Sequence, residues 1–528
     1  GASEVRLSNQ NPYTTSVDIE SQIILKGGYS TCSEAEIDNQ VHSNAVINAA
    51  GFGLHALKIR RVEDANVLID SINLINGEDS ALQLIANDGL ITLNNVQITD
   101  STGESAGGVY VFNYQTTQSP KLLNVVMKET VIKNNEAVYF GGGLSCQSVS
   151  GNVPINLQLS GGTVFHSNPA NNRGGGLNLN GCDMQFEAAH NLSINNGHRE
   201  IYDNTSVDSG GGLSIQDADV SLLGDEFKAF TILNNEAGDL QNSNISGGGL
   251  FVVGESEVTL INAHVNNNVA QQYGAGLYTS AGSKVFMDVA DGGCRYDQYC
   301  SKLQGNQLEG NNAYGAAVAA TGGEMSVKRT LIELNKSSQF GYVAHGRNDA
   351  QLTFEGNLII YNGSTDGSVA NYGFHVQNSG SLHFYYNTSF RNLLTGNFID
   401  MSDSSSLFMI GNIVDEYADI LYTSVDASAE INCNMMSQDN NITVSMTGTI
   451  IGSADFIDPS TFGNFRLNES SVNAMDVCSD VPYEPGKDLS NSYRGVDNPD
   501  VMNINGLYDL GAYEFNENWD VIFSNSFD

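Results

Sequence analysis

Positive charge is scarce in this 528-residue sequence, which has 22 Lys and Arg residues against 60 Asp and Glu residues and a formal net charge of −38. Such an acidic chain repels phosphate groups, which excludes nucleic acid and anionic membrane surfaces as partners. The sequence also has no run of about 18 apolar residues, which excludes a membrane-spanning helix. The excess of acidic residues favours a secreted protein and leaves divalent cations as candidate ligands.

Short motifs for cofactors and nucleophiles are missing as well. The sequence has no Cys-x-x-Cys pair, so we expect no structural zinc site. It has no phosphate-binding loop, no dinucleotide fingerprint and no serine-nucleophile elbow. These absences argue against nucleotide-dependent enzymes and serine hydrolases.

Glycine and asparagine are abundant, and they are arranged in a repeat. The phrase Gly-Gly-Gly-Leu, or Gly-Ala-Gly-Leu in the last copy, begins at residues 141, 174, 210, 247 and 274, in steps of 33, 36, 37 and 27 residues. Asparagines precede each copy. Periods in this range are typical of solenoids, in which one structural unit stacks on the next.

Each repeat carries the alternating pattern of β-strands. Leu213–Ile215 and Leu250–Val252 place alternate residues on one face, and a second strand such as Val258–Leu260 follows. Glycine and asparagine at this density exclude long helices and suit bends with positive φ. Three short strands and three bends per repeat predict an all-β fold, a single right-handed parallel β-helix with caps at both ends. Stacked asparagines can form hydrogen-bonded ladders in such a fold.

The chain divides into a solenoid and two ends. Residues 1–50 are predicted as an N-terminal cap, because a solenoid end exposes unpaired strand edges and an open core. Residues 51–455 are predicted as the β-helix, and residues 456–528 as an irregular C-terminal cap. The opening residues Gly1–Ser3 fit what remains after a signal peptide has been removed, or a cloning remnant.

Motifs near both ends resemble a known family. They are Ile24–Cys32 (ILKGGYSTC), Phe456–Pro459 (FIDP), Phe465–Leu467 (FRL) and Leu507–Glu514 (LYDLGAYE). These segments resemble secreted bacterial β-helix proteins that end in a choice-of-anchor Q domain. The Asn and Gly-Gly-Leu repeats are similar to the passenger repeats of polymorphic outer-membrane proteins and other adhesin-like autotransporters. The resemblance implies a parallel β-helix and export, and its members include adhesins and carbohydrate-active enzymes. No sorting signal follows Glu514, so the resemblance does not extend to surface anchoring.

Seven cysteines in an exported chain predict disulfides with one residue left over. The expected pairs are Cys294 with Cys300 in an insertion between rungs, Cys146 with Cys182 on neighbouring rungs, and Cys433 with Cys478 between the last rungs and the C-terminal cap. Cys32 is then the unpaired residue.

A column of polar residues is the first candidate site. Similar strand segments begin at Gln351, Ser381 and Ser406, and their offsets of 30 and 25 residues place His345, His375 and Asp400 at one position of three successive rungs. Alternation points His375 outward. Further polar and aromatic residues extend this patch: Arg347, His383, Tyr385, Tyr386 and Arg391. An ordinary solvated sheet face is the first interpretation of this patch; as a site, it would contact a glycan or, less readily, hold a metal.

Acidic bends give a second candidate, a calcium site. Asp288, Asp291 and Asp297 lie in or beside the insertion between rungs, and carboxylate oxygens are ligands that Ca²⁺ prefers. The nonapeptide calcium repeat is absent from the sequence. Solvated acidic loops are therefore the favoured interpretation, and calcium is the alternative.

These observations favour a secreted or cell-surface protein, monomeric and adhesin-like, that binds an extracellular glycan or another surface component along one face without catalysis. The competing class is a polysaccharide lyase or a glycoside hydrolase. The aspartate pair and Gly-His-Gly of the hydrolases with this fold are not found in the sequence. We therefore assign no catalytic residue; for an enzyme, the candidates are His345, His375, Asp400 and Arg347.

Overall fold

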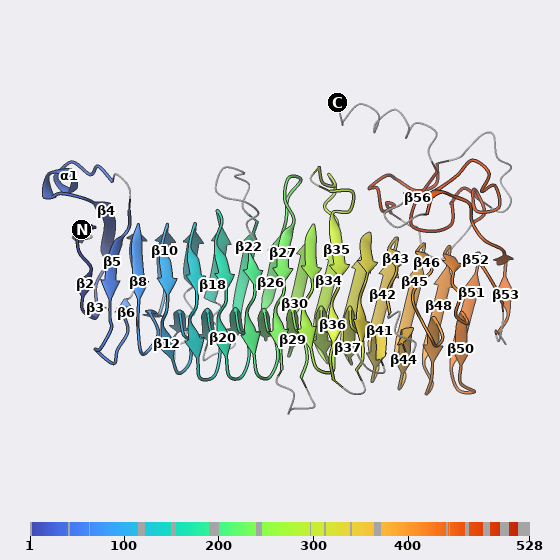
Figure 1. Ribbon diagram of the computed structural model, residues 1–528, viewed down its shortest axis with the longest axis horizontal. Coiled ribbons are helices and arrows are strands. Elements are labelled where there is room, and N and C mark those ends of the chain that lie inside the picture. The colour runs from blue at the N-terminus through green and yellow to red at the C-terminus, as the bar shows by residue number, and fades with distance from the viewer. Residues whose placement is uncertain are drawn as a thin grey trace.

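The protein is a stack of parallel strands in the computed structural model (Figure 1). Sheet A has 16 strands from β1 (Ser3–Ser8) to β53 (Met446–Thr447), and sheet B has 16 from β2 (Tyr13–Thr14) to β54 (Ile450–Ile451). Sheet C has 14 strands from β3 (Val17–Ile19) to β50 (Leu421–Thr423). The predicted parallel β-helix is confirmed. The structure describes residues 3–515 except 41–42, 63, 114–121, 149–154, 189–199, 239–244, 296, 311–312, 338–340, 364–370, 440–441, 443, 460–463, 479–485 and 497–505.

Alternation along each strand builds the core. In β25 (Leu213–Gln216), Leu213 and Ile215 are fully buried inside the solenoid, while Ser214 and Gln216 lie on the outer side. The parallel register places Leu213 beside Leu250 of the next rung. Like residues therefore stack on like residues, and one core cluster runs from the first rungs to the last.

The glycine-containing rungs include a fourth sheet that the sequence analysis did not predict. Eight two-residue strands, from β12 (Thr102–Gly103) to β40 (Lys336–Ser337), form sheet D between sheets B and C. Gly174 has a φ of +67°, which glycine adopts at little cost, and a Cβ on Gly175 would lie 2.3 Å from the carbonyl oxygen of Thr205. The glycines thus allow the backbones of neighbouring rungs to approach closely.

An asparagine ladder holds the bend between sheets B and D. Its members, one per rung, are Asn135, Asn168, Asn204, Asn235, Asn268, Asn306, Asn335, Asn362 and Asn392. The backbone N and the Nδ2 of Asn235 both donate to Oδ1 of Asn268 at 3.0 Å, and this Nδ2 also donates to the carbonyl of Ile201. The ladder thereby satisfies buried polar groups along the bend.

The residues predicted as an N-terminal cap already pair within the sheets. β1 pairs with β4 (Ile23–Tyr29), and β2 pairs with β5 (Ala45–Asn48). The connection between β4 and β5 contains α1 (Cys32–Glu36), the one helix among the described residues. None of the described chain forms a helix that is long and apolar enough to cross a membrane.

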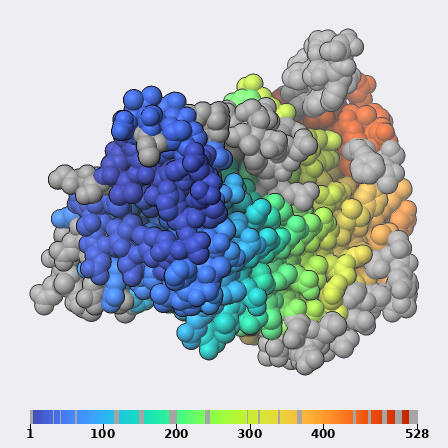
Figure 2. All heavy atoms as spheres, turned by 60° about the vertical axis from the view of Figure 1, so that its left-hand side comes forward, coloured from blue at the N-terminus to red at the C-terminus, as the bar shows by residue number. Residues whose placement is uncertain are grey.

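The C-terminal residues form a lobe on the flank of sheet B, beside β43 (Leu358–Ile360) and β46 (Thr388–Phe390) (Figure 1). Its apolar core includes outward side chains of sheet B: Leu331, Leu358, Ile360, Phe390, Ile413 and Met435. Figure 2 shows the lobe above the parallel bands of successive rungs. The lobe packs there because these apolar side chains point out of the solenoid and must be covered.

Within the lobe, the Asp509–Glu514 motif is an anchoring element. The amide of Gly511 donates to the carbonyl of Gly411, and the amide of Ala512 donates to the Thr388 hydroxyl at 2.9 Å. A Cβ on Gly511 would lie 2.5 Å from that hydroxyl oxygen. The motif therefore joins the lobe to the solenoid by direct backbone contact.

All three predicted disulfides are present: Cys146–Cys182, Cys294–Cys300 and Cys433–Cys478. The first lies in the solenoid core, the second closes the insertion loop, and the third joins the lobe to a bend of the solenoid. The side chain of Cys32 lies outside the described residues.

Candidate functional site

The predicted polar column has the expected register. His345 of β41 (Gly341–Arg347) pairs with His375 of β44 (Asn371–Gln377), which pairs with Asp400 of β47 (Ile399–Met401). Phe374 and Val376 lie in the core, so His375 is on the outer side of sheet C. The offsets read from the sequence therefore hold in three dimensions.

Other rings enclose the two histidines of this column. The His375 ring lies 4.4 Å from that of Tyr342, and the His345 ring lies 4.6 Å from that of Tyr314, between ring centroids. His345 is fully buried and His375 is 7% exposed. Burial lowers the pKa of His375 to about 4 and the pKa of His345 well below its ordinary value, so both are neutral at physiological pH. Burial also raises the pKa of Asp400 to about 6.

Stacked tyrosines continue the same ribbon of rings. Tyr273, Tyr314 and Tyr342 follow one another with centroids 5.4 and 5.9 Å apart and planes within 14° of parallel. The Arg347 guanidinium lies 4.6 Å from the centroid of the Tyr273 ring. The rings thus cover one another's faces, and a sugar would find few ring faces free for stacking.

The remaining residues of the predicted patch lie elsewhere. His383 and Tyr385 belong to β45 (Ser381–Tyr385) of sheet A, where the His383 ring meets that of Phe408 at 5.1 Å. Tyr386 is fully buried, with the guanidinium of Arg494 from the lobe over its ring. Arg391 follows β46 of sheet B and lies over the Phe390 ring. The structure therefore distributes these residues over different faces.

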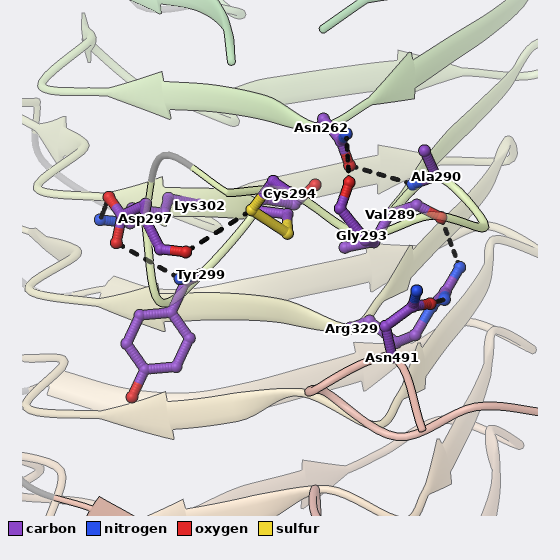
Figure 3. The surroundings of a disulfide bond; sticks show 12 residues. Asn262, Val289, Ala290, Gly293, Cys294, Asp297, Tyr299, Lys302, Arg329 and Asn491 are labelled. Carbon is purple, nitrogen blue, oxygen red and sulfur yellow. Dashed lines mark hydrogen bonds and ion pairs between the residues drawn. A yellow bond between two sulfur atoms is a disulfide. The ribbon is translucent and has the colours of Figure 1, made fainter. Parts of the chain in front are cut away.

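The three aspartates considered for calcium each face a basic residue, as Figure 3 shows for Asp297 and Lys302. Asp297 is paired with Lys302, and Asp288 accepts from Nε of Arg329 at 2.8 Å. The side chain of Asp291 lies 3.7 Å from Nζ of Lys487. Within the described ranges, no group of three or more His, Cys, Asp or Glu side chains could hold a metal ion.

A polar hollow elsewhere on sheet C was not found by the sequence analysis. It has a volume of about 320 Å³ and spans the rungs of β17 (Leu144–Ser148), β21 (Leu177–Asn180) and β25. Its lining residues, which we call the amide trough, are Phe140, Gln147, Asn172, Arg173, Asn178, Asn180, Asp208, Ser214 and Gln216. Most of these are amides and hydroxyls on rigid strands.

The strand register explains why this hollow exists. One column on the outer side of sheet C reads Tyr110, Ser145, Asn178, Ser214 and Phe251 along successive rungs. The neighbouring column places Gln147, Asn180 and Gln216 after Phe112. Three rungs of small or polar side chains thus lie between bulkier residues, Tyr110 and Phe112 on one side and Phe251 and Val253 on the other, which we call the end walls.

One ion pair lies within the trough. The Nε of Arg173 donates to Oδ2 of Asp208 at 3.2 Å, and the guanidinium lies 5.3 Å from the Phe251 ring centroid. The side chains of Arg173 and Asp208 are 36% and 40% exposed, so a ligand can reach both. The lining residues therefore carry one positive and one negative charge.

A regular spacing in the sequence marks the trough. Gln147, Asn180 and Gln216 each lie three residues after the marker leucine of their repeat. The same position carries Val253 in the next repeat, where the trough has ended. Comparing repeats position by position would have identified the amides.

No protein-family model matches this chain, and no curated protein matches it. The geometry of the described residues is therefore the basis for inferring a function.

Proposed function

We propose that this protein is a non-catalytic, adhesin-like glycan-binding protein and that its ligand occupies the amide trough. The observation that carries the proposal is the hollow of about 320 Å³ lined by five amide side chains, an ion pair and a phenylalanine ring. Binding pockets are concave and hold a small number of fixed polar groups. The trough meets this description on a surface built from rigid strands.

Amide side chains suit a ligand rich in hydroxyl groups. Asn and Gln each present one acceptor and one donor group, and a sugar hydroxyl both donates and accepts. Asp208 and Arg173 add a charged acceptor and a charged donor, which form stronger hydrogen bonds than neutral groups. Phe140 supplies an apolar ring surface for the carbon face of a sugar.

The trough is a better candidate than the histidine column. The rings of His345 and His375 pack against tyrosine rings and are almost inaccessible. In the trough, Asn180 is exposed and Gln147 and Gln216 are partly exposed. A glycan can therefore form hydrogen bonds there without displacing packed side chains.

We also infer export and family membership from indirect support. Three disulfides fit an oxidising compartment outside the cytoplasm. The Asp509–Glu514 motif and the glycine repeats support a place among secreted β-helix proteins of the choice-of-anchor Q or autotransporter type.

A glycan array followed by calorimetry on the strongest hit tests the proposal. We expect Asn180→Ala and Gln216→Ala each to weaken binding about tenfold, the loss of roughly one good hydrogen bond. Gln185→Ala is the matched control, because it removes an exposed amide from sheet A just after the rung of Asn180. Unchanged affinity in both trough variants, with loss in His375→Ala or His383→Ala, would move the site to the originally predicted residues.

The same glycans test the competing lyase or hydrolase function. The trough offers a single carboxylate, Asp208, whereas glycoside hydrolases use two. New double bonds or new reducing ends in the incubated glycans would contradict the proposal. Their absence, together with binding, supports it.

A further inference from the structure

The trough repeats its chemistry along the solenoid axis. The column of exposed and partly exposed amides presents Gln147, Asn180 and Gln216 on three successive rungs, while Asn178 and Ser214 of the neighbouring column line the floor of the trough and are nearly buried. Neighbouring strands lie about 4.8 Å apart. A ligand along the axis therefore meets the same kind of polar group at equal steps, whereas a ligand across the strands meets different groups.

We infer that the ligand is a neutral, linear glycan that lies parallel to the solenoid axis and contacts one monosaccharide unit per rung over three rungs. This inference rests on the proposed function, because it specifies the ligand of the same trough. An extended chain of pyranose rings advances by a step close to the strand spacing, so successive hydroxyl-bearing units can lie beside successive rungs. A periodic ligand thus matches a periodic surface.

The charge of the site favours a neutral glycan over an acidic one. Arg173, the one cation among the lining residues, is paired with Asp208. A uronate or sulfate on each sugar unit would find no further cation in the trough to pair with. The net charge of −38 adds a long-range repulsion of polyanions.

The end walls set the length of the bound segment. Tyr110 and Phe112 occupy the two columns before the trough, and Phe251 and Val253 occupy them after it. Three rungs lie between these walls. The affinity should therefore increase from one to three sugar units and then remain constant.

Calorimetry with oligosaccharides of one to six units tests this inference on the intact protein. The probes are neutral series built from glucose, mannose or xylose and acidic series built from galacturonate or mannuronate. We expect a neutral series to gain at least tenfold in affinity up to three units and to level off. Preference for an acidic series, or an affinity that does not depend on length beyond one unit, would overturn the inference and leave glycan binding intact. If no series binds and the array gives no hit, the proposed function itself is contradicted.

Shortening the trough gives a second, independent measurement. Gln147→Ala and Gln216→Ala remove the outer amide from the first and the last rung. Each should weaken trisaccharide binding about tenfold and change disaccharide binding less than twofold, because two complete rungs remain. Equal losses for both lengths would contradict one sugar unit per rung, and Gln185→Ala should change neither. Thermal unfolding of each variant checks that the solenoid is intact.

Discussion

At the scale of single residues, Glu416 ends the asparagine ladder in an unusual way. It takes the position after Asn392, whose backbone N donates to its Oε2 at 2.8 Å and whose Nδ2 donates to its Oε1 at 2.6 Å. The side chain is buried, and burial raises its pKa from 4.5 to about 8. The carboxyl group therefore keeps its proton in the folded protein at neutral pH.

This burial predicts a pH dependence of stability. The unfolded chain loses the Glu416 proton near pH 4.5, and the folded protein loses it near pH 8, so the free energy of unfolding falls as the pH rises between these values. The contribution amounts to at most about 5 kcal/mol. Urea denaturation from pH 4 to pH 9 should show that the free energy of unfolding of Glu416→Gln lacks this fall with rising pH. The exposed Glu430→Gln serves as control, and an unchanged slope in Glu416→Gln would contradict the assignment.

An interior member of the ladder should be costly to remove. Asn268 accepts from the backbone N and the Nδ2 of Asn235 and donates to Asn306 and to the carbonyl of Ile232. Asn268→Ala leaves these buried groups without partners, so we expect a loss of roughly 3 kcal/mol in the free energy of unfolding. Chemical denaturation measures it. The exposed Asn180→Ala should cost less than about 0.5 kcal/mol, and equal effects would argue against the ladder.

At the scale of elements, the bends require a backbone position with positive φ, and asparagine is common there. The position just before each ladder asparagine carries Asn134, Asn234 and Asn267 in three rungs, all with φ near +54°. Leu334 occupies the same position with a φ of +57° and a side chain that is 48% exposed. A leucine pays a steric cost in this left-handed region that asparagine largely avoids.

Leu334→Asn should therefore stabilise the protein by about 1 kcal/mol, because it relieves backbone strain and removes an exposed apolar side chain. Thermal or chemical denaturation measures the change. Asn234→Leu is the reciprocal variant and should destabilise by a similar amount or more, since Asn234 also donates to Asp203. A stabilising effect of Asn234→Leu would refute the strain argument.

Other positive-φ bends connect the solenoid to its lobe. Arg329, Tyr386 and Cys433 have φ values between +46° and +56°. Their side chains contact Asn491, Arg494 and Cys478 of the lobe, respectively. The bends thus direct side chains sideways, out of the stack of strands.

At the scale of the whole molecule, the Cys433–Cys478 disulfide should limit the motion of the lobe. It closes a segment of 45 residues, and its loss in Cys433→Ser/Cys478→Ser should cost roughly 2–4 kcal/mol of lobe stability. Hydrogen exchange should accelerate in residues 452–515 and not in the core strands of the early rungs, because rungs contact mainly their neighbours. Cys294→Ser/Cys300→Ser, which opens a loop of 6 residues, should leave the lobe unchanged. Uniform acceleration along the chain would contradict this separation.

The sequence by itself determined the repeated features of this protein. Every repeat shows the same local pattern: period-2 alternation in the strands, glycines where backbones approach closely, and asparagines at the bends. The offsets between similar strands placed His345, His375 and Asp400 in register, and the cysteine spacing predicted the three disulfides. These features could be predicted because neighbouring rungs obey one rule.

The tertiary structure alone decided what covers each outer face. It stacked Tyr314 and Tyr342 against the histidines, moved His383 and Tyr385 to another sheet, and packed the lobe on sheet B. It also left the amide trough open between the bulkier side chains of its end walls. These outcomes depend on contacts between side chains far apart in the sequence and on the sizes of neighbours across several rungs. The alternation of one strand indicates which side chains point outward, and it contains no information about what they meet there.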